Sequence, residues 1–480
     1  MIRPVVPALL ASALVACSGP TPGGGPPLPD TGEDAVCAAW TFDVTPTHWA
    51  LPAGASSGAF TRAERDVADC VDGLPATRLV DLTGDNRLDF VQLSDCDDPS
   101  VGAATWRVWP AVGAAEGAGF GEEVAWQLPG ADPGAFAAFR DDAVCTDGVT
   151  LPAFRLEHLD DDGRLDLVVI EGCEDDALAG AWRGYPNTGA GFGAAQLREI
   201  PTPYAPGSFG APRETEQCGD FGNAPAWGVV DLDGDGPVDI VLTDTCDTPD
   251  VGSTYWAHLA NDGATFAPGA RWGVPPELRA NRLGRALGCG LGNADYFLLD
   301  VEGDDRPDLV VPRRCGAEGS DWTVYTNEGT GFASVGAVRR APWSLNLLVN
   351  QREHPAPECD LALPAWVMDD ADGDGDADVT VTASCVDPAV GDARWDLHAL
   401  TREGWSAAAP VALPTGYSTG SFAGGTGDTP GCAGTANRPA WVRRDLDGDG
   451  APELVVTEAC ADPSVGVDGW LVYRMTCIEG

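Results

Sequence analysis

Short apolar runs separated by acidic, glycine-rich turns recur along the chain. The clearest turn covers residues 231–239 (Asp-Leu-Asp-Gly-Asp-Gly-Pro-Val-Asp), with an apolar run before it and another at 240–242. A third run begins with tryptophan, and a fourth follows a glycine-rich turn that ends in an aromatic residue. Runs of this kind between turn residues are typical of β-strands. The pattern therefore predicts a unit of four short strands in which the acidic turn joins the first two.

The unit repeats six times. Its acidic turns, numbered here as loops 1 to 6, start at residues 81, 158, 231, 300, 370 and 445, which lie 69 to 77 residues apart. Self-similarity at a nearly fixed period is the signature of a repeat architecture. The acids at the key positions of the six loops are Asp81, Asp85, Asp89; Asp160, Asp162, Asp166; Asp231, Asp233, Asp235, Asp239; Asp300, Glu302, Asp304, Asp308; Asp370, Asp372, Asp374, Asp378; and Asp445, Asp447, Asp449, Glu453.

These acids predict cation sites, with a solvated acidic turn as the alternative. Alternating aspartates, with glycines that allow φ > 0, bring several carboxylates to one point, where they repel by roughly 4 kcal/mol per pair at about 4 Å. Ca²⁺, which takes about six to eight oxygen ligands in flexible geometry, suits such a loop better than magnesium. Loops 3, 5 and 6 are the best candidates, whereas Thr83 and His158 leave loops 1 and 2 with three acids each. We expect the ion to stabilise the fold and to have no catalytic role.

Tryptophan opens the third run in every unit, as Trp106, Trp182, Trp256, Trp322, Trp395 and Trp470. A ring that recurs at one strand position in every unit predicts a core packed between units. Stacking of these rings on a sugar is the alternative. His258 and His398 also lie in third strands, but not at equivalent positions, and we expect both to be packed or exposed and not to be catalysts or metal ligands.

Four-stranded units repeated radially are typical of a β-propeller, which leaves only short, protected edges. Six units predict an all-β fold, a six-bladed β-propeller of four-stranded antiparallel blades. The acidic loops and the turns at 187–192 and 327–332 (Asn-Thr-Gly-Ala-Gly-Phe and Asn-Glu-Gly-Thr-Gly-Phe) resemble the FG-GAP/VCBS repeat family, best known from integrin α-chain propellers. The resemblance implies a calcium-binding propeller. Integrin propellers have seven blades, and here the count of six is followed.

Twelve of the 15 cysteines flank the acidic loops in pairs separated by 26 or 28 residues. If each loop is a hairpin turn, the two cysteines lie at the open end of that hairpin, where Cα atoms can approach to about 5.5 Å. Free thiols and zinc sites are the alternatives, but the chain has no CxxC pair and only five scattered histidines. An oxidising compartment and six disulfides are therefore predicted, namely Cys70–Cys96, Cys145–Cys173, Cys218–Cys246, Cys289–Cys315, Cys359–Cys385 and Cys432–Cys460.

The two ends of the repeat region are expected to close the ring together. The last unit ends after its third strand, whereas residues 47–52 resemble the fourth strand of other units. We expect this N-terminal strand to complete the last blade. Cys37 and Cys477 stand at opposite ends of the region, and a disulfide between them would lock the closure.

The N-terminus has the layout of a secretory signal, with Arg3, an apolar stretch and small residues. Residues 14–17 (Leu-Val-Ala-Cys) resemble the bacterial lipobox, which implies cleavage before Cys17 and lipidation of that residue; an ordinary signal peptide is the alternative. Ser18 then suggests the outer membrane. The predicted organisation is a signal peptide at 1–16, a Pro/Gly-rich tether at 17–36 and the propeller at 37–480.

Charge narrows the partners. The net charge is -46, from 74 acidic and 28 basic residues, and none of the basic residues is lysine. Nucleic acid and anionic membrane surfaces are poor partners for such a chain, so membrane contact is expected only through the N-terminal lipid. We expect a monomeric scaffold in the cell envelope that binds an extracellular protein or glycan and is not an enzyme. The alternative is an enzyme, of the polysaccharide lyase or hydrolase type, with its active site in the central funnel.

Overall fold

A computed structural model defines the architecture. The residues that it describes are 39–52, 60, 62–113, 117–130, 134–146, 149–173, 178, 180–201, 209, 218, 225–278, 295–301, 303–313, 322–339, 353–354, 357, 359, 364–401, 404–424, 427, 430–432 and 436–478. The predicted signal peptide, Cys17 and the tether lie outside these residues.

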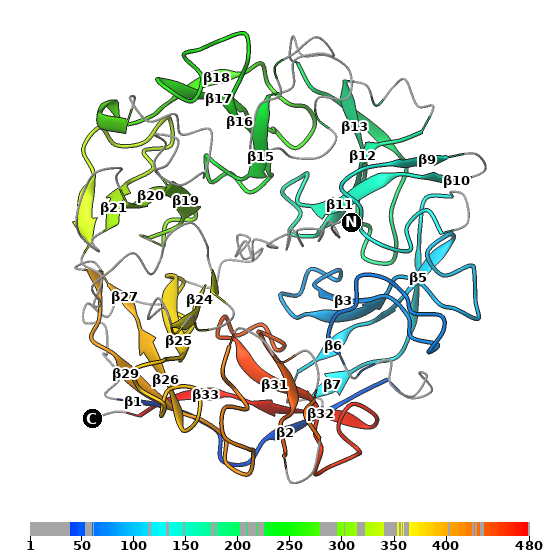
Figure 1. Ribbon diagram of the computed structural model, residues 1–480. Helices are drawn as coiled ribbons and strands as arrows, with labels where there is room; N and C mark the ends of the chain where they lie inside the picture. The colour runs from blue at the N-terminus through cyan, green and yellow to red at the C-terminus, as the bar shows by residue number, and fades with distance from the viewer. Residues whose placement is uncertain are drawn as a thin grey trace, which may run out of the picture.

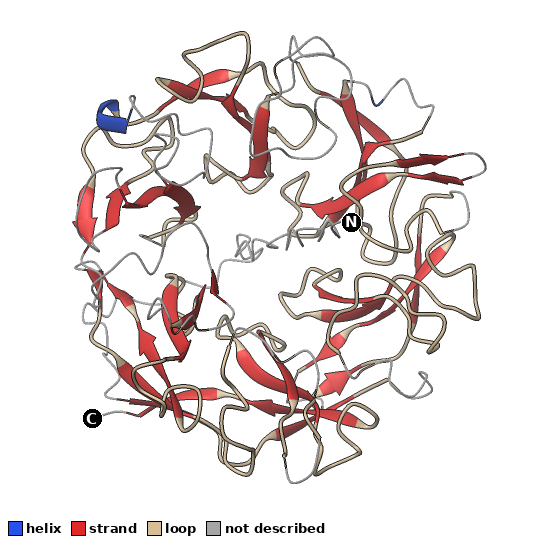
Figure 2. Cartoon of the chain, viewed as in Figure 1, coloured by secondary structure: helices blue, strands red, loops and turns tan. Residues whose placement is uncertain are grey.

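Six four-stranded antiparallel blades stand in a ring, which confirms the predicted six-bladed β-propeller (Figures 1 and 2). The strands of the blades, from the innermost to the outermost, are as follows. Blade 1 is β3 (Thr77–Val80), β4 (Asp89–Gln92), β5 (Thr105–Trp109) and β8 (Val124–Gln127); blade 2 is β11 (Ala153–Glu157), β12 (Asp166–Glu171), β13 (Ala181–Tyr185) and β14 (Gln196–Glu199); blade 3 is β15 (Ala226–Val230), β16 (Asp239–Asp244), β17 (Tyr255–Leu259) and β18 (Ala270–Gly273); blade 4 is β19 (Asp295–Leu299), β20 (Asp308–Arg313), β21 (Trp322–Tyr325) and β22 (Ala337–Arg339); blade 5 is β24 (Ala365–Asp369), β25 (Asp378–Ala383), β26 (Arg394–His398) and β29 (Ala409–Ala412); and blade 6 is β30 (Ala440–Arg444), β31 (Glu453–Glu458), β32 (Gly469–Tyr473) and β2 (Thr47–Ala50).

Burial along each blade follows from its place between two neighbours. The second strands are almost wholly buried, as in β4 and β16, because both of their faces pack against other blades. The outermost strands are mostly exposed except for their third residue, for example Trp126 in β8 and Trp272 in β18. Every acidic loop joins the first strand of its blade to the second, as the sequence predicts.

Aromatic side chains join each blade to the next. The tryptophan of one third strand meets an aromatic residue from the glycine-rich turn of the following blade at ring-centroid distances of 4.0 to 5.6 Å. The pairs are Trp106–Phe192, Trp182–Phe266, Trp256–Phe332, Trp322–Trp405 and Trp470–Phe120. Edge-to-face contacts of this kind add about 0.5–1.5 kcal/mol to the free energy of area burial. The predicted interblade core is confirmed.

The N-terminal segment supplies the fourth strand of blade 6. Strand β2 pairs antiparallel with β32, with Trp49 opposite Trp470, so the predicted closure of the last blade is confirmed. Phe42 meets Trp395 of blade 5 edge-on at 5.4 Å, and so replaces the turn aromatic that blade 6 lacks. Trp470 donates its indole N–H to the carbonyl oxygen of Phe60 at 2.8 Å, as Trp106 does to that of Phe136.

The two chain ends also pair with each other. Strand β1 (Ala39–Phe42) lies parallel to β29 of blade 5 and antiparallel to the C-terminal strand β33 (Met475–Ile478). The other short strands are β6 (Ala111–Val112), β7 (Gly119–Phe120), β9 (Val144–Thr146), β10 (Val149–Leu151), β23 (Glu353–His354), β27 (Leu400–Thr401) and β28 (Gly404–Trp405), and η3 (Pro276–Leu278) is a 3₁₀ turn. No helix among the described residues is long and apolar enough to cross a membrane.

Five of the six predicted blade disulfides are formed. They are Cys70–Cys96, Cys145–Cys173, Cys218–Cys246, Cys359–Cys385 and Cys432–Cys460, with Cα atoms 5.3 to 5.6 Å apart. Cys289 and Cys315 lie outside the described residues. Cys477 is disulfide-bonded, and Cys37, its expected partner, also lies outside them.

Peptide mapping of the non-reduced protein tests the two remaining pairs. We expect one cross-linked peptide that joins Cys37 to Cys477 and another that joins Cys289 to Cys315, since each pair completes a pattern of hairpin or terminal closure. The five pairs described above serve as internal controls in the same digest. Alkylation of Cys37 and Cys477 as free thiols would defeat the closure lock.

Candidate metal-binding loops

The first aspartate of a loop shapes the turn. Asp231 accepts hydrogen bonds from the backbone N–H groups of Gly234 at 2.8 Å and Gly236 at 2.9 Å, and both glycines have positive φ. Loops 1, 4, 5 and 6 repeat these hydrogen bonds around Asp81, Asp300, Asp370 and Asp445, but in loops 1 and 4 the second donor is Asn86 or Asp305, a non-glycine residue with positive φ. The turn is therefore held by backbone donors before any cation is added. Glycine favours this turn because it reaches φ > 0 without steric cost.

The acid at the ninth position connects the loop to the rest of the blade. Asp239, which is fully buried, accepts the backbone N–H of Leu232 on one oxygen and that of Asn261, just after the third strand, on the other, at 3.0 and 2.9 Å. The side-chain amide of Asn261 in turn donates to the carbonyl oxygen of Leu159 in the loop of blade 2. Asn187 and Asn327 make the same link to the preceding blade. Loop, blade and neighbouring loop thus form one hydrogen-bonded network.

The acid at the third position of a loop has capacity left for a cation. In loops 2, 3, 5 and 6 one oxygen of this acid is buried and has no hydrogen-bond partner among the described residues, namely Oδ1 of Asp160, Asp233, Asp372 and Asp447. A buried carboxylate oxygen without a partner carries a desolvation cost of about 1–3 kcal/mol or more. The recurrence of this unpartnered oxygen at one loop position provides a ligand atom for a cation.

The acids converge in the three loops that the sequence ranks highest. Oxygens within 4.8 Å of one another come from Asp231, Asp233 and Asp235 in loop 3, from Asp370, Asp372 and Asp374 in loop 5, and from Asp445, Asp447, Asp449 and Glu453 in loop 6. In loops 1, 2 and 4 the described acids form no such group, and Glu302 of loop 4 is not described.

An arginine occupies the seventh position of loops 1, 2 and 4. Arg87, Arg164 and Arg306 each pair with the fifth-position acid of their own loop. Loops 3, 5 and 6 have Pro237, Asp376 and Ala451 at this position. The chain therefore has two kinds of acidic loop, one with an internal counter-charge and one without.

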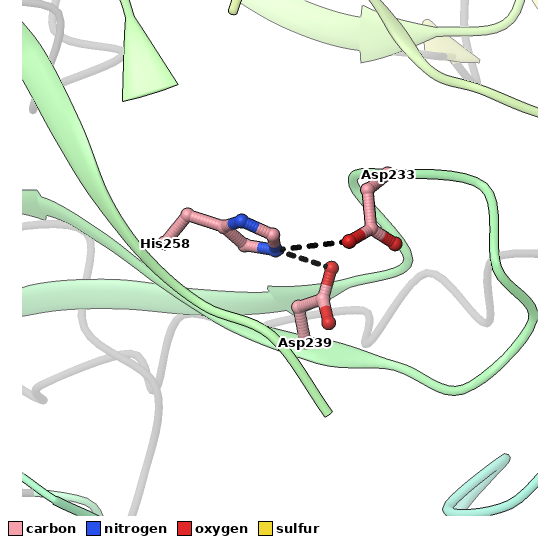
Figure 3. Close-up of side chains that lie close together, drawn as sticks. All are labelled: Asp233, Asp239 and His258. Carbon is pink, nitrogen blue, oxygen red and sulfur yellow. Dashed lines mark hydrogen bonds and ion pairs between the residues drawn. The ribbon is translucent and has the colours of Figure 1, made fainter. Parts of the chain in front are cut away.

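His258 is packed, as predicted, but contrary to expectation it also belongs to a group of side chains that could hold a metal ion. Its Nε2 is 2.7 Å from Oδ2 of Asp239 and 3.9 Å from Oδ2 of Asp233, as Figure 3 shows. The ring is 4% exposed and packs edge-on against Trp272. Sequence reasoning missed this because the contact depends on how far the third strand slides past the second. Its signal was the place of His258 two residues after Trp256.

Two arginines that the sequence analysis did not single out also face the loops. Arg474, which follows β32, pairs with Asp447 in loop 6. Arg198 stands at the third position of β14, where β8 and β18 have tryptophan, and is 1% exposed. Its charge lowers the pKa of Asp160 and Asp166, although burial outweighs this effect. His398 lies elsewhere, with Nδ1 at 3.1 Å from the carbonyl oxygen of Ser406.

Burial raises the pKa of five of the loop acids, and neighbouring carboxylates raise it further. The pKa reaches about 7 for Asp89, Asp166 and Asp372, about 8 for Glu453 and about 9 for Asp378. Without a cation, these groups hold protons near neutral pH. A bound cation would favour the charged form and reverse these shifts.

The ligand atoms of the loops suit a hard cation with a structural role. They are carboxylate oxygens on a turn that backbone N–H groups already hold, which is the ligand type that Ca²⁺ prefers. The loops lie side by side: a Cβ added to Gly84 of loop 1 would come within 2.5 Å of the Arg164 side chain of loop 2. A cation in one loop would therefore order the edge of two blades.

No family model matches the chain, and no curated protein does, so its resemblance to FG-GAP/VCBS repeats stays a prediction. Similar solved structures include a chain of the Photorhabdus luminescens Tc holotoxin pore (13% identity, TM-score 0.47, covering 92% of this chain and 15% of that one). Another is the α-L-arabinofuranosidase Arb93A from Fusarium graminearum (7% identity, TM-score 0.34, covering 91% of this chain and 98% of that one). The Dos1 propeller is also similar (8% identity, TM-score 0.30, covering 92% of this chain and 95% of that one). The architecture is established by this chain's own strand pairing and not by these likenesses.

Removal of calcium is expected to lower the melting temperature. A ligand at about 100 times its Kd stabilises a protein by about 2.7 kcal/mol per site, so several filled loops give a large shift between calcium and EDTA. Asp372→Asn keeps the size of the side chain and removes one charge from loop 5, and should reduce the shift and weaken one calcium site. The exposed Asp392→Asn is the matched control. An EDTA-insensitive melting temperature would contradict the stabilising role.

The calcium-free protein should lose stability as pH rises. The unfolded pKa of Asp and Glu is about 4, whereas the folded values cited above are about 7 to 9, so the folded state binds more protons in this interval. Stability then falls with rising pH wherever the folded state holds the extra protons. In EDTA, the melting temperature should therefore be higher at about pH 5.5 than at about pH 8.5. Saturating calcium should flatten this dependence, and an opposite slope in EDTA would refute the explanation.

Proposed function

We propose that the chain is a calcium-stabilised propeller lipoprotein of the bacterial cell envelope that binds another protein or a glycan without catalysing a reaction. The observation that supports it best is the unpartnered oxygen that recurs on the acid at the third loop position, since this oxygen is a suitable ligand for calcium at the blade edges. Calcium sites that only order blade edges leave the loops as a rigid surface. A rigid, pre-ordered surface lowers the entropic cost of binding.

Charge favours a basic partner. The net charge is -46, and only some of the loop carboxylates are paired with arginine. Complementary charge steers encounter and discriminates against acidic surfaces. A protein with a basic face is therefore favoured over an acidic glycan.

The tryptophans give little support to sugar stacking. Fourteen of the 16 are buried, Trp40 is partly buried, and Trp343 lies outside the described residues. The rings of the third strands, such as Trp256, face the next blade and not solvent. This weakens the glycan alternative and favours recognition through loops and charge.

Several arginines of the innermost strands serve to join blades. Figure 1 shows β3, β11, β15, β19 and β24 nearest the centre of the ring. Glu64 lies between Arg78 of β3 and Arg444 of β30, at 3.4 and 3.3 Å, and so links blade 1 to blade 6. Arg443 pairs with Asp369 of blade 5 at 3.1 Å. These arginines therefore have a structural role as partners of acids in neighbouring blades, and no observation assigns them to a substrate.

Partner binding is best tested with the full processed protein on an array of surface proteins and glycans, in calcium and in EDTA. We expect binding to basic proteins that weakens as salt is raised, since exposed charges are screened over about 8–10 Å at ordinary ionic strength. Binding should disappear in EDTA if the ordered loops form the surface. Cleavage of a polysaccharide without stable retention would instead support the enzyme alternative.

A further inference from the structure

His258 gives blade 3 a donor that the other blades lack at this position. It stands two residues after the tryptophan of the third strand and pairs with Val241. The equivalent residues, which pair with the same position of the second strand, are Val108, Gly184, Val324, Leu397 and Val472. Five blades thus place an apolar residue or glycine beside the loop, and blade 3 places an imidazole nitrogen there.

This nitrogen points at two carboxylates that have limited access to solvent or to further hydrogen-bond donors. Asp239 is fully buried, and its Oδ2 already accepts the backbone N–H of Leu232. Asp233 has a buried Oδ1 without a hydrogen-bond partner among the described residues. Ligand atoms of His258, Asp233 and Asp239 lie within 4.8 Å of one another (Figure 3). Trp272 holds the ring in place, with centroids 4.9 Å apart.

The donor set differs from that of the neighbouring loops. Loops 5 and 6 gather carboxylate oxygens only, which suit Ca²⁺. An imidazole nitrogen with carboxylates suits borderline transition-metal ions, and Zn²⁺ is bound by His nitrogen and Asp oxygen at about 2.0–2.2 Å. Within one ring, the chain offers two kinds of coordination chemistry.

We propose that blade 3 holds a transition-metal site of the Zn²⁺ class, formed by His258 Nε2 with the carboxylates of Asp239 and Asp233. The metal takes the place of the hydrogen bond between Nε2 and Asp239. Asp233 is shared with the group of Asp231 and Asp235, so one loop cannot fill both arrangements independently. Blade 3 therefore selects a different ion from blades 5 and 6.

The observed distances need only small changes. Two ligand atoms bonded to one metal at about 2.1 Å lie about 3.0–3.4 Å apart in octahedral or tetrahedral geometry. The Nε2–Asp239 distance of 2.7 Å must open slightly, and the Nε2–Asp233 distance of 3.9 Å must close slightly. Asp233 lies on the loop, where a side-chain rotation can close its distance. The backbones of His258 and Asp239 are held in adjacent strands, so the distance between these two opens through small rotations of their side chains.

The proposal rests on the metal-binding role of the acidic loops, but the two can fail separately. Blades 5 and 6 report calcium binding without a histidine in their groups. Loss of calcium binding with retained zinc binding would defeat the calcium scaffold and leave the zinc site standing. Calcium binding with no zinc site would defeat only the present inference.

Metal titration of the full, metal-stripped protein tests the site, with Zn²⁺ and Co²⁺ as probes in the presence of excess calcium. We expect one Zn²⁺ per chain and a visible Co²⁺ absorption band. His258→Val, which introduces the residue found in blades 1, 4 and 6, should weaken Zn²⁺ binding at least about tenfold, since even outer partners of a metal site contribute about 10–100-fold. Calcium binding by the other loops should persist. His48→Gln, at an exposed histidine, is the matched control.

Equal Zn²⁺ affinity in His258→Val and wild type would overturn the proposal. Far-ultraviolet circular dichroism and the melting temperature in calcium establish whether the variant is folded. If it is not, X-ray absorption at the zinc edge of the wild-type protein decides, because a bound imidazole gives its own scattering signature. A zinc environment without imidazole overturns the proposal, and one imidazole among oxygen ligands supports it.

Discussion

The buried acid at the ninth position of each loop is the constraint on which the propeller depends. It begins the second strand in a buried position. In loops 1 and 3 its oxygens accept hydrogen bonds from backbone N–H groups of the loop and of the turn after the third strand, whereas Oδ2 of Asp166 in loop 2 has no hydrogen-bond partner among the described residues. A charge in such a place is costly unless it is fully hydrogen-bonded or neutralised. The loop, the third strand and the turn of the neighbouring blade are thus all arranged around one carboxylate.

The six loops offset the negative charge of their acids in different ways. Loops 1, 2 and 4 bring an arginine to the fifth-position acid, blade 3 brings a histidine, and loop 6 receives Arg474 from the end of its third strand. Loop 5 has the densest charge, since its seventh position is Asp376, whose pKa burial and neighbouring acids raise to about 7. A repeated backbone geometry therefore allows each blade its own means of neutralising charge, and cation demand varies around the ring.

Local repetition made most of the fold predictable. The period, the six units, the blade disulfides and the closing strand all follow from patterns within or between neighbouring segments. The position of His258 and the burial of Arg198 could not be predicted, because they depend on the slide of one strand past another and on the wedge between blades. The role of Phe42 was hidden for a similar reason, since only ring closure shows that it stands where Phe192 or Phe266 stands elsewhere.

The N-terminal strand that completes blade 6 has a consequence for how the protein reaches its folded state. Trp49 and Trp470 are partners although about 420 residues separate them, so β2, which is synthesised early, must wait for the last blade. Until then, blade 5 lacks its Phe42 contact and blade 6 lacks a strand, and both expose an unfinished sheet edge. Such edges are prone to pairing with other chains. An interrupted or truncated chain is therefore exposed to aggregation, whereas a completed ring has its two ends, usually the first parts to fray, paired with each other.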